Sequence, residues 1–411
     1  MRILFVSNLY PPYELGGMEQ LCQETCDGLT ARGHTCHVLT SRFRVPRGAA
    51  PEPGITRALH LQADVYHYRP LDFFLRRPSQ ERANRRALRA AIDSFRPDIV
   101  FVWGMWNLSL SLAYWAERWM PGRVAYAVAG YWFLPPNVHE AYWQAPAKRA
   151  WVEALKTLAR WLANRILARE RRAHPLALEQ VACVSEFVRT KLAEAGVLPN
   201  GARVIYNGID PAPFLDASAA RQARADALRL VYVGGVAQHK GVHTAVEALG
   251  LLQQRGQAGG LSLTVVGGGH PDYQAGLMRR VAALGLEQQV AFIGRVPRDQ
   301  IARILAEHDV FLFTSVWEEP IARTVMEAMA SGLAVIGTAV GGQREMFVHR
   351  ENALVFPPGD AAALAETIIQ LKASPALVHD IAQAGLRTVL ERFTLDRMID
   401  ETEAWLQEIT L

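Results

Sequence analysis

Cysteine is scarce in this chain, with only Cys22, Cys26, Cys36 and Cys183 among its 411 residues. No two of them are separated by two residues, and no histidine cluster lies beside them at the spacing of a zinc site. This density argues against the disulfide framework of a secreted domain. We therefore expect reduced thiols, a cytoplasmic protein and no bound metal.

The chain also lacks a long apolar run that is free of turn residues. The run that follows Met1 is short and ends at two prolines and Glu14, so it predicts a buried strand and not a signal peptide. Residues 99–116 carry no charge over a length that could cross a bilayer, but a glycine, an asparagine and two serines interrupt them. We expect a buried strand, a loop and a helix there, with a membrane span as the alternative.

No low-complexity linker divides the chain, yet 411 residues are too many for one ordinary domain. Half of the residues are hydrophobic and a fifth are charged, which is typical of soluble globular domains. In both halves short apolar runs alternate with segments of helical periodicity, and this order predicts parallel sheets covered by helices. The predicted strands are ILFVSN, CHVLTS, IVFVWG, VAYAVAG and VACVS in the first half, and RLVYVGG, SLTVVGGG, VAFIG, VFLFTS and AVIGT in the second.

The pattern therefore predicts an α/β fold of two Rossmann-like domains, with a boundary near VIYNGIDPAPFLD. Asn207 and Gly208 form a turn signal there, and Pro211 and Pro213 are expected to prevent regular structure from continuing. We place the first domain at residues 1–208 and the second at 209–391. A last helix, at about 392–411 with Thr394 or Asp396 as its cap, is assigned to the first domain.

Charge is divided unevenly between the halves. Residues 1–208 hold 27 Lys and Arg against 17 Asp and Glu, whereas the rest of the chain holds 17 against 23. A basic half joined to an acidic half suggests that the first half meets something anionic.

Because ligands of parallel sheets bind beyond the carboxyl ends of the strands, we searched the loops that follow the predicted strands. Gly16 and Gly17 follow the first strand and precede a helix that begins near Met18, whose N-terminal amides suit an anion. A purely structural glycine turn explains this loop equally well.

A second glycine loop, with Gly234 and Gly235, follows the strand RLVYV and leads to Lys240 at the start of the next helix. A glycine-rich strand end with one lysine suits a diphosphate, while a solvated surface lysine is the alternative. Two further clusters, at residues 267–269 and 341–345, also follow strands, and each could be a structural turn.

The most specific motif is EPIARTVME, in which seven residues separate Glu319 from Glu327. If a helix begins near Ala322, Glu319 lies in the loop before it and Glu327 lies just over one turn inside. Carboxylates suit sugar hydroxyls, and the amides at a helix N-terminus suit phosphate. The residues around Glu327 are small and apolar, so its carboxylate is expected to need a partner or a ligand rather than to face solvent.

On these motifs the chain resembles family 4 of the retaining glycosyltransferases over essentially its whole length. The matching blocks are PPYELGGMEQ, ARGHTCHVLTS, CVSEFV, VIYNGID and VWEEPIARTVMEAMASGLAVIGTAVGGQRE. The resemblance implies a GT-B fold, in which two Rossmann-like domains face each other across a cleft and the C-terminal helix returns to the first lobe. It implies transfer of a sugar from a UDP- or GDP-linked donor to an acceptor hydroxyl with retained anomeric configuration, without a metal or another cofactor.

The same resemblance implies roles for individual residues. Glu319 and Lys240 would be catalytic, because Glu319 would hold the donor sugar's hydroxyls while Lys240 neutralised the diphosphate. Glu327 would accept from the ribose hydroxyls. The residues implied to bind the donor are Gly16, Gly17, Gly234, Gly235, Lys240, Gly267, Arg295, Val296, Glu319, Ile321, Ala322, Arg323, Thr324, Val325 and Glu327.

The chain departs from the family's pattern in its second half. The family usually has an arginine at the place of Gly235, so one of two phosphate cations is missing, and His239 or Arg323 is a candidate replacement. Ile321 and Ala322 stand where the family has an aromatic residue and a glycine.

A further departure lies in the first half, where Ala129 replaces the histidine that usually lies beside the reacting sugar, with His139 as a candidate substitute. These departures leave open a catalytically silent nucleotide-sugar-binding or scaffold protein of the same fold. A sugar phosphorylase or a nucleotide-sugar epimerase is a third hypothesis, although the lysine context that a phosphorylase needs for its cofactor is not evident.

Residues 145–175 combine apolar side chains at helical spacing with eight Lys or Arg. This pattern fits a helix on an anionic membrane surface, at the inner face of the membrane, and it suggests a glycan or lipid-linked acceptor. The alternative is an ordinary surface helix that packs its Trp and Leu side chains inward. No nucleic-acid-binding module is present, so nucleic acid is not an expected partner.

Overall fold

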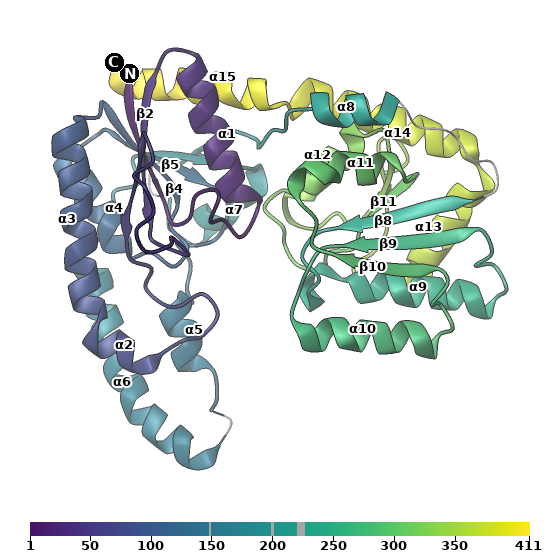
Figure 1. Ribbon diagram of the computed structural model, residues 1–411, viewed down its shortest axis with the longest axis horizontal. Helices are drawn as coiled ribbons and strands as arrows, with labels where there is room; N and C mark the ends of the chain where they lie inside the picture. The colour runs from purple at the N-terminus through teal and green to yellow at the C-terminus, as the bar shows by residue number, and fades with distance from the viewer. Residues whose placement is uncertain (148, 199–200, 220–226) are drawn as a thin grey trace. The chain divides into compact units, whose positions relative to one another are not determined.

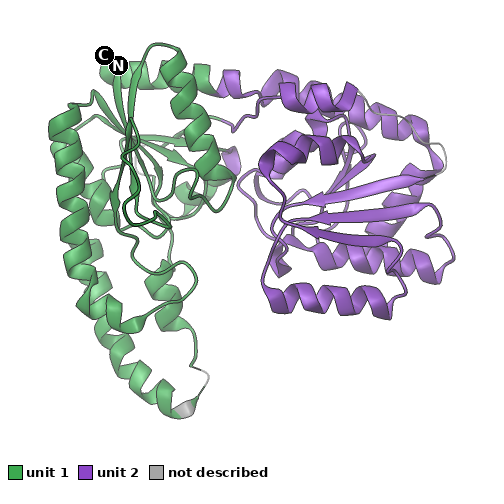
Figure 2. Ribbon diagram, in the orientation of Figure 1, with its two compact units in different colours: residues 1–184, 188–205, 399–411 green, residues 185–187, 206–398 purple. Residues whose placement is uncertain are grey.

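The computed structural model describes residues 1–147, 149–198, 201–219 and 227–411 (Figure 1). It divides into two compact units (Figure 2). Unit 1 contains Met1–Val184, Val188–Ile205 and Ile399–Leu411, and unit 2 contains Ser185–Phe187 and Tyr206–Met398. The sequence places its boundary after Gly208 and gives the whole last helix to the first domain, whereas the compact units divide after Ile205 and within that helix.

The sheet of unit 1 has the strand order β3-β2-β1-β4-β5-β6-β7, and neighbouring strands are parallel. This arrangement confirms a Rossmann-like sheet and each of the five strands expected here, while β3 and β7 were not foreseen. Its strands are β1 Arg2–Ser7, β2 Thr35–Ser41, β3 Ile55–Leu59, β4 Ile99–Gly104, β5 Val124–Val128, β6 Gln180–Cys183 and β7 Arg203–Val204.

Helices cover both faces of this sheet, with α1 on one face and α3 and α4 on the other (Figure 1). Three more helices, α2, α5 and α6, lie together at one end of the unit. The helices are α1 Gly17–Ala31, α2 Pro70–Leu75, α3 Arg77–Phe95, α4 Leu110–Trp119, α5 Val138–Gln144 and α6 Ala150–Ala173, with α7 Glu186–Glu194 continuing from unit 2.

The uncharged segment at 99–116 forms β4, a loop and the first part of α4, as expected. The β4 strand is buried, because it lies in the middle of the sheet. Among the described helices none combines the length and the apolar character needed to cross a bilayer.

The last helix, α15 Leu395–Thr410, returns to unit 1, as the fold prediction requires. The hydroxyl of Thr394 accepts a hydrogen bond from the amide of Arg397 at 3.3 Å, which confirms Thr394 as the cap. Farther along the helix the ring of Trp405 packs edge-on against Phe101 of β4, and Glu403 forms an ion pair with Arg32.

The sheet of unit 2 has the order β10-β9-β8-β11-β12-β13, again with parallel neighbours. The order reverses between β8 and β11, and the loops that follow such strands form the usual ligand site of this fold class. All five strands expected in this half are present, and β13 was not foreseen. The strands are β8 Leu228–Val233, β9 Leu261–Val266, β10 Val290–Gly294, β11 Val310–Phe313, β12 Ala334–Gly337 and β13 Leu354–Val355.

In unit 2, α9 and α10 lie along one face of the sheet and α11 and α12 along the other (Figure 1). Leucine, isoleucine and valine side chains of the strands form a buried core with α9 and α13. The helices are α8 Ala212–Ala219, α9 Val242–Gln254, α10 Pro271–Ala283, α11 Ile301–Ala306, α12 Arg323–Ala330, α13 Ala361–Ala373 and α14 Pro375–Arg392, with 3-10 turns η1 Gln238–Lys240, η2 Arg298–Gln300 and η3 Gly341–Glu345.

Two local expectations were wrong. Pro211 and Pro213 do not end regular structure, because α8 begins between them at Ala212 and the first turn of a helix tolerates proline. The basic helix α6 does not pack most of its Trp and Leu side chains inward, since Trp151, Leu155, Leu158 and Leu162 are exposed.

Candidate functional site

The loops after β8, β9 and β10 are joined by backbone hydrogen bonds. The amide of Val236 donates to the carbonyl of Gly268 at 2.9 Å, and the amide of Gly267 donates to the carbonyl of Gly294 at 2.8 Å. A Cβ at Gly267 would lie 1.8 Å from the carbonyl oxygen of Gly234, so only glycine permits this approach. The predicted loop residues Gly234, Gly235 and Gly267 therefore lie together at the carboxyl edge of the sheet.

Lys240 ends the short turn η1, directly before α9. Its carbonyl accepts a hydrogen bond from the Thr314 hydroxyl at 2.9 Å, which ties the turn to the loop after β11. Its ammonium group also lies 5.7 Å from the ring centroid of Trp317. These contacts place the lysine over the loop that carries the carboxylate motif.

The ammonium of Lys240 forms an ion pair with the carboxylate of Glu319. The same carboxylate oxygen, Oε1, accepts a hydrogen bond from the Ser315 hydroxyl at 3.0 Å. Glu319 is only 6% exposed. The two residues that the sequence proposed as catalytic are thus in direct contact, at the point where the order of the strands reverses.

The loop after β12 holds the backbone of Glu319 in place. The amide of Gly342 donates to the carbonyl of Glu319 at 2.8 Å. Gly341 has φ +56°, and a Cβ there would lie 2.0 Å from the carbonyl oxygen of Glu319. The glycine cluster that follows β12 is therefore a structural support for Glu319.

Glu327 lies inside α12 and is 2% exposed. Its Oε1 lies 2.9 Å from Nη1 of Arg298, in the turn η2 that follows β10. The carboxylate therefore has the partner that its small, apolar surroundings require. Arg298 was not among the predicted site residues, although a basic residue in a loop after a predicted strand is the signal that could have identified it.

The helix α12 begins at Arg323, after Ala322 as its N-cap, so the expected helix start is confirmed. The amide of Ala322 donates to the side chain of Gln343 at 2.7 Å. Ile321, Arg323 and Val325 are buried, and Thr324 is half-buried. The amide of Ala322, which was proposed to bind the nucleotide sugar, therefore already donates to Gln343, a residue of the glycine cluster at 341–345 that was not among the predicted site residues.

Arg295 and Val296 directly follow β10. The Arg295 side chain lies against Gly268, since a Cβ on that glycine would be 2.8 Å from Nε of Arg295. The structure thus brings Arg295 to the β9 loop, on the side of the sheet edge away from β11.

His239, a candidate for the missing phosphate cation, lies in the turn η1 beside Lys240. Burial and the neighbouring charge of Lys240 lower the pKa of its imidazole below the ordinary value, which disfavours a positive charge. Arg323 is the first residue of α12 and is buried there. At Gly235 itself an ideal Cβ would have no atom within 4 Å, so the fold does not require glycine at this position.

In unit 1, Gly16 and Gly17 are exposed at the start of α1, where Gly16 is the N-cap. The amide of Gly16 donates to the carboxylate of Glu19 at 3.1 Å. The nearest atom to an ideal Cβ at Gly16 is 3.7 Å away, so the local packing leaves room for a side chain there.

Ala129 follows β5 and is half-buried, and its candidate substitute His139 lies in α5 at 1% exposure. Nδ1 of His139 is 2.8 Å from the hydroxyl of Tyr68, and its ring packs edge-on against Phe73. Burial, together with the charge of Arg77, lowers the pKa of His139 to about 3. The imidazole is therefore neutral near pH 7.

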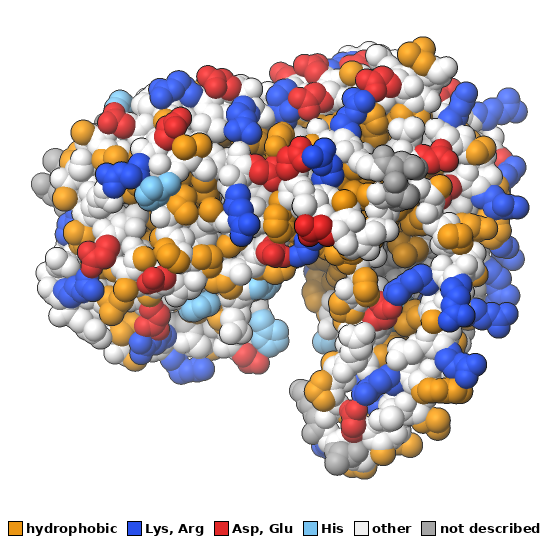
Figure 3. Space-filling model, turned by 180° about the vertical axis from the view of Figure 1, so that it is seen from behind, with side chains coloured by type: hydrophobic (Ala, Val, Ile, Leu, Met, Phe, Trp, Pro, Cys, Tyr) orange, Lys and Arg blue, Asp and Glu red, His pale blue; other side chains and the backbone are white. Residues whose placement is uncertain are grey.

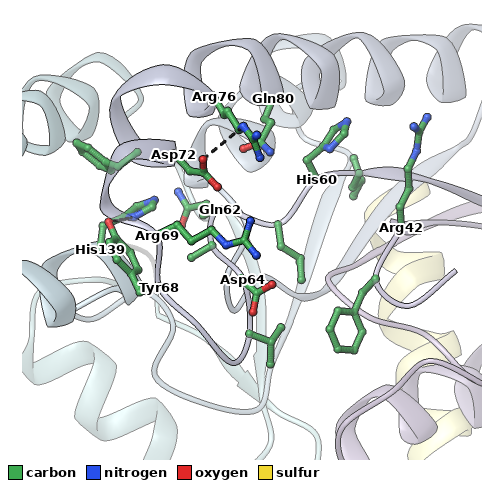
Figure 4. A pocket seen from close by; sticks show the side chains of 16 residues that line it. Arg42, His60, Gln62, Asp64, Tyr68, Arg69, Asp72, Arg76, Gln80 and His139 are labelled. Carbon is green, nitrogen blue, oxygen red and sulfur yellow. Dashed lines mark hydrogen bonds and ion pairs between the residues drawn. The ribbon is translucent and has the colours of Figure 1, made fainter.

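His139 also lines a pocket of about 300 Å³ that lies wholly in unit 1 (Figure 4). Carboxylate, amide and guanidinium groups share its walls with aromatic rings, and the dashed line in Figure 4 joins Asp72 to Arg76. Its polar and aromatic lining is Arg42, Phe43, His60, Gln62, Asp64, Tyr68, Arg69, Asp72, Phe73, Arg76, Gln80 and His139.

Two family models match the chain. The model "Glycosyltransferase Family 4" matches residues 15–213, and the model "Glycosyl transferases group 1" matches residues 216–388. A glycogen synthase of Mycobacterium tuberculosis is 26% identical over 96% of this chain and 91% of its own length. The amylovoran biosynthesis glycosyltransferase AmsK of Erwinia amylovora is 32% identical, over 51% of each chain.

Solved structures share the fold of the whole chain. A glycosyltransferase of Rickettsia africae superposes with a TM-score of 0.71 at 19% identity, over 99% of this chain and 98% of its own. Anabaena Alr3699/HepE, whose structure contains UDP and glucose, superposes with a TM-score of 0.69 at 19% identity, over 98% of this chain and 99% of its own. With both halves matched by family models, this chain belongs to the family 4, group 1 glycosyltransferases and has their GT-B fold.

Proposed function

We propose that this protein is a retaining glycosyltransferase that moves a sugar from a nucleoside diphosphate sugar to an acceptor hydroxyl, in the biosynthesis of a polysaccharide or glycolipid. The observation that carries the proposal is the ion pair of Lys240 and Glu319 at the reversal point of the unit 2 sheet. One cation and one carboxylate lie together where a diphosphate and the sugar attached to it would both be bound.

In this proposal the ion pair of Lys240 and Glu319 opens when the nucleotide sugar binds, and both side chains then contact the nucleotide sugar. The ammonium of Lys240 turns to the diphosphate, and the Glu319 carboxylate accepts hydrogen bonds from the sugar's hydroxyls. Departure of the nucleoside diphosphate builds negative charge on its oxygens, and a cation fixed beside them stabilises that charge. Neutralisation is assigned to Lys240 and backbone amides, so the reaction is written without a metal.

The second carboxylate serves the nucleoside. Glu327 is held by Arg298 and lies one turn inside α12, so it is proposed to accept from the ribose hydroxyls while Arg295 and Val296 flank the base. The first-turn amides of α12 face the diphosphate in this scheme, where the helix dipole also favours an anion. Retention requires the acceptor oxygen to bond the anomeric carbon on the face that the diphosphate leaves, with the acceptor proton passing to the departing diphosphate.

For the acceptor we propose the unit 1 pocket of Figure 4. Planar carboxylate and amide groups such as Asp64, Asp72 and Gln62 suit sugar hydroxyls, and the aromatic side chains of Tyr68 and Phe73 line the pocket beside them. These polar and aromatic groups support a glycan acceptor, either free or attached to a lipid.

The test is turnover with a panel of UDP-, GDP- and ADP-sugars, in which release of the nucleoside diphosphate is measured with and without candidate glycan acceptors. We expect base-selective release that Glu319→Gln and Lys240→Ala each lower. Nuclear magnetic resonance of the product then reports whether the anomeric configuration is retained.

Two outcomes would redirect the proposal. Base-selective binding without any release, for every sugar offered, would favour the silent nucleotide-sugar-binding protein that Ala129 and Gly235 suggest. Release with inverted anomeric configuration would keep the donor site and contradict the retaining mechanism.

A further inference from the structure

The helix α6 presents one continuous line of side chains to solvent. Successive members of this line are separated by four and three residues in alternation, so they lie on one side of the helix. We name this line the α6 stripe: Trp151, Leu155, Leu158, Leu162, Arg165, Arg169 and Arg172.

The stripe is apolar in its first half and cationic in its second. Trp151 is 64% exposed and Leu158 is 73% exposed, and the other apolar members are also exposed. Arg165, Arg169 and Arg172 are exposed as well. An exposed row of four large apolar side chains is unusual on a protein surface that faces only water.

The opposite side of α6 already has its own packing. Ala163 and Leu167 are buried there with Phe73 of α2 and Trp143 of α5. Lys156 is 8% exposed, donates to the carbonyl of Ala145 at 2.5 Å and lies 4.3 Å from the ring centroid of Tyr142. The stripe is therefore not the side by which α6 packs on unit 1, because other residues of the helix make those contacts.

Carboxylates are directed away from the stripe. Glu153 forms an ion pair with Arg160, and Glu170 forms one with Arg77. The neighbouring helix α2 adds two exposed leucines, Leu71 and Leu75, at the same end of unit 1. In the face drawn in Figure 3, hydrophobic and basic side chains gather over this end of the unit.

We propose that the α6 stripe docks on an anionic lipid surface, with its apolar half in the acyl boundary and its arginines at the headgroups. Tryptophan and leucine are suited to that boundary, and arginine can keep its charge at the phosphates while its stem lies lower. Each basic residue near such a surface gains from the negative surface potential.

A second copy of the chain fits the stripe less well. Helices paired in parallel would place arginine against arginine, and antiparallel helices would place arginines against leucines. The apolar half is also shorter than the three or four heptads typical of a stable coiled coil. An anionic lipid surface offers acyl chains to the apolar half of the stripe and phosphates to its arginines.

The experiment is flotation of the full-length protein with vesicles of phosphatidylcholine alone or of phosphatidylcholine and phosphatidylglycerol in equal parts. We expect binding to the anionic vesicles that falls at least tenfold in Leu155→Ser/Leu158→Ser and in Arg169→Gln/Arg172→Gln, and that weakens with added salt. The matched control is Met278→Ser/Leu390→Ser, which removes two exposed apolar side chains from unit 2 and should bind as the wild type does.

A second readout does not depend on the folding of the leucine and arginine variants. Brominated acyl chains should quench wild-type tryptophan fluorescence, and the quenched fraction should shrink in Trp151→Phe. Failure of the wild type to bind anionic vesicles at low salt overturns the proposal. So does equal binding by the leucine variant, or a dimer in sedimentation that the leucine variant abolishes without any vesicle binding. Because vesicle binding is measured without nucleotide, its outcome is separate from that of the glycosyltransferase proposal.

Discussion

Lys240 and Glu319 are 79 residues apart in the chain and meet in one ion pair. If this pair handles the diphosphate and the sugar, Lys240→Ala should lower kcat/KM by roughly 10²- to 10³-fold, because a fixed charge aimed at the leaving group is lost. Steady-state kinetics with the preferred donor measure the effect. Lys372, an exposed lysine of unit 2, donates to the backbone carbonyls of Gln257 and Gly259, so Lys372→Ala is the control and should leave kcat/KM unchanged.

Gly235 allows a test in which the affinity for a nucleotide is expected to increase. An ideal Cβ there has no atom within 4 Å, so Gly235→Arg should fold normally and place a second cation beside the proposed diphosphate site. We expect tighter binding of a nucleoside diphosphate, by about tenfold, since a charge-assisted hydrogen bond contributes roughly 1.5–3 kcal/mol. Calorimetric titration measures it. Unchanged affinity in a folded variant would place the diphosphate elsewhere.

At the residue scale the sequence was informative about charged residues in motifs and silent about their partners. The spacing of Glu319 and Glu327 predicted a loop carboxylate and a buried helical carboxylate, and the structure has both. Gln343 could not be assigned, and only the position of Arg298 after a predicted strand pointed to it, because the contacts of both residues depend on how η2 and η3 approach α12. Such approaches between loops of different strands leave no local pattern in the chain.

At the scale of elements, η3 supports the loop that carries Glu319. Gly341→Ala would force a Cβ to within 2.0 Å of the Glu319 carbonyl oxygen, so we expect lower stability together with weaker donor binding. Gly285→Ala is a matched control, because its φ of +66° is similar while its Cβ would meet no atom within 4 Å. Thermal unfolding with and without nucleotide measures both. The control should lose about 1 kcal/mol of stability and keep its ligand-induced shift; equal ligand shifts in the two variants would contradict the supporting role of η3.

The elements themselves were largely predictable. The strands that were predicted are dense apolar runs bounded by turn residues. The strand β3 contains a threonine and an arginine within five residues, and β7 and β13 have two residues each, so these three strands gave no clear signal. The helix α6 shows where periodicity fails. Its sequence has apolar residues on two sides, and only the packing of Ala163 and Leu167 against α2 and α5 determines which side is buried.

For the whole molecule, buried histidines predict acid sensitivity. His139 has a pKa of about 3 in the fold, against 6.5 when unfolded, so the unfolded chain binds its proton first as pH falls. The contribution of His139 to stability is therefore complete above pH 6.5 and is lost progressively between pH 6.5 and about 3.

His139→Gln should make the free energy of unfolding fall less steeply over that range, by about 1 kcal/mol per pH unit. Urea unfolding at a series of pH values measures the slope. His379→Gln, an exposed histidine of α14, should keep the wild-type slope. Identical slopes for His139→Gln and the wild type would show that this imidazole is not the group that titrates.

The two-domain architecture followed from the sequence because alternating strands and helices allow few topologies, and both sheets have the strand order that such a chain favours. The chemistry was less predictable, since the pocket proposed for the acceptor is lined mainly by the loop after β3 and by residues of α2, α3 and α5, without a spaced motif. The uneven charge of the two halves suggested an anionic partner for unit 1, and we propose the α6 stripe as the place where it binds.

The most direct test of the donor site is a titration of wild type and Glu327→Gln with UDP, GDP and ADP. The control is Glu366→Gln, which breaks an exposed ion pair with Arg255 elsewhere in unit 2. We predict base-selective binding to the wild type and the control, weakened at least tenfold in Glu327→Gln because the ribose loses a charged acceptor. Equal affinity of all three proteins, or no binding of any nucleotide, would contradict the account of unit 2 as the donor-binding unit.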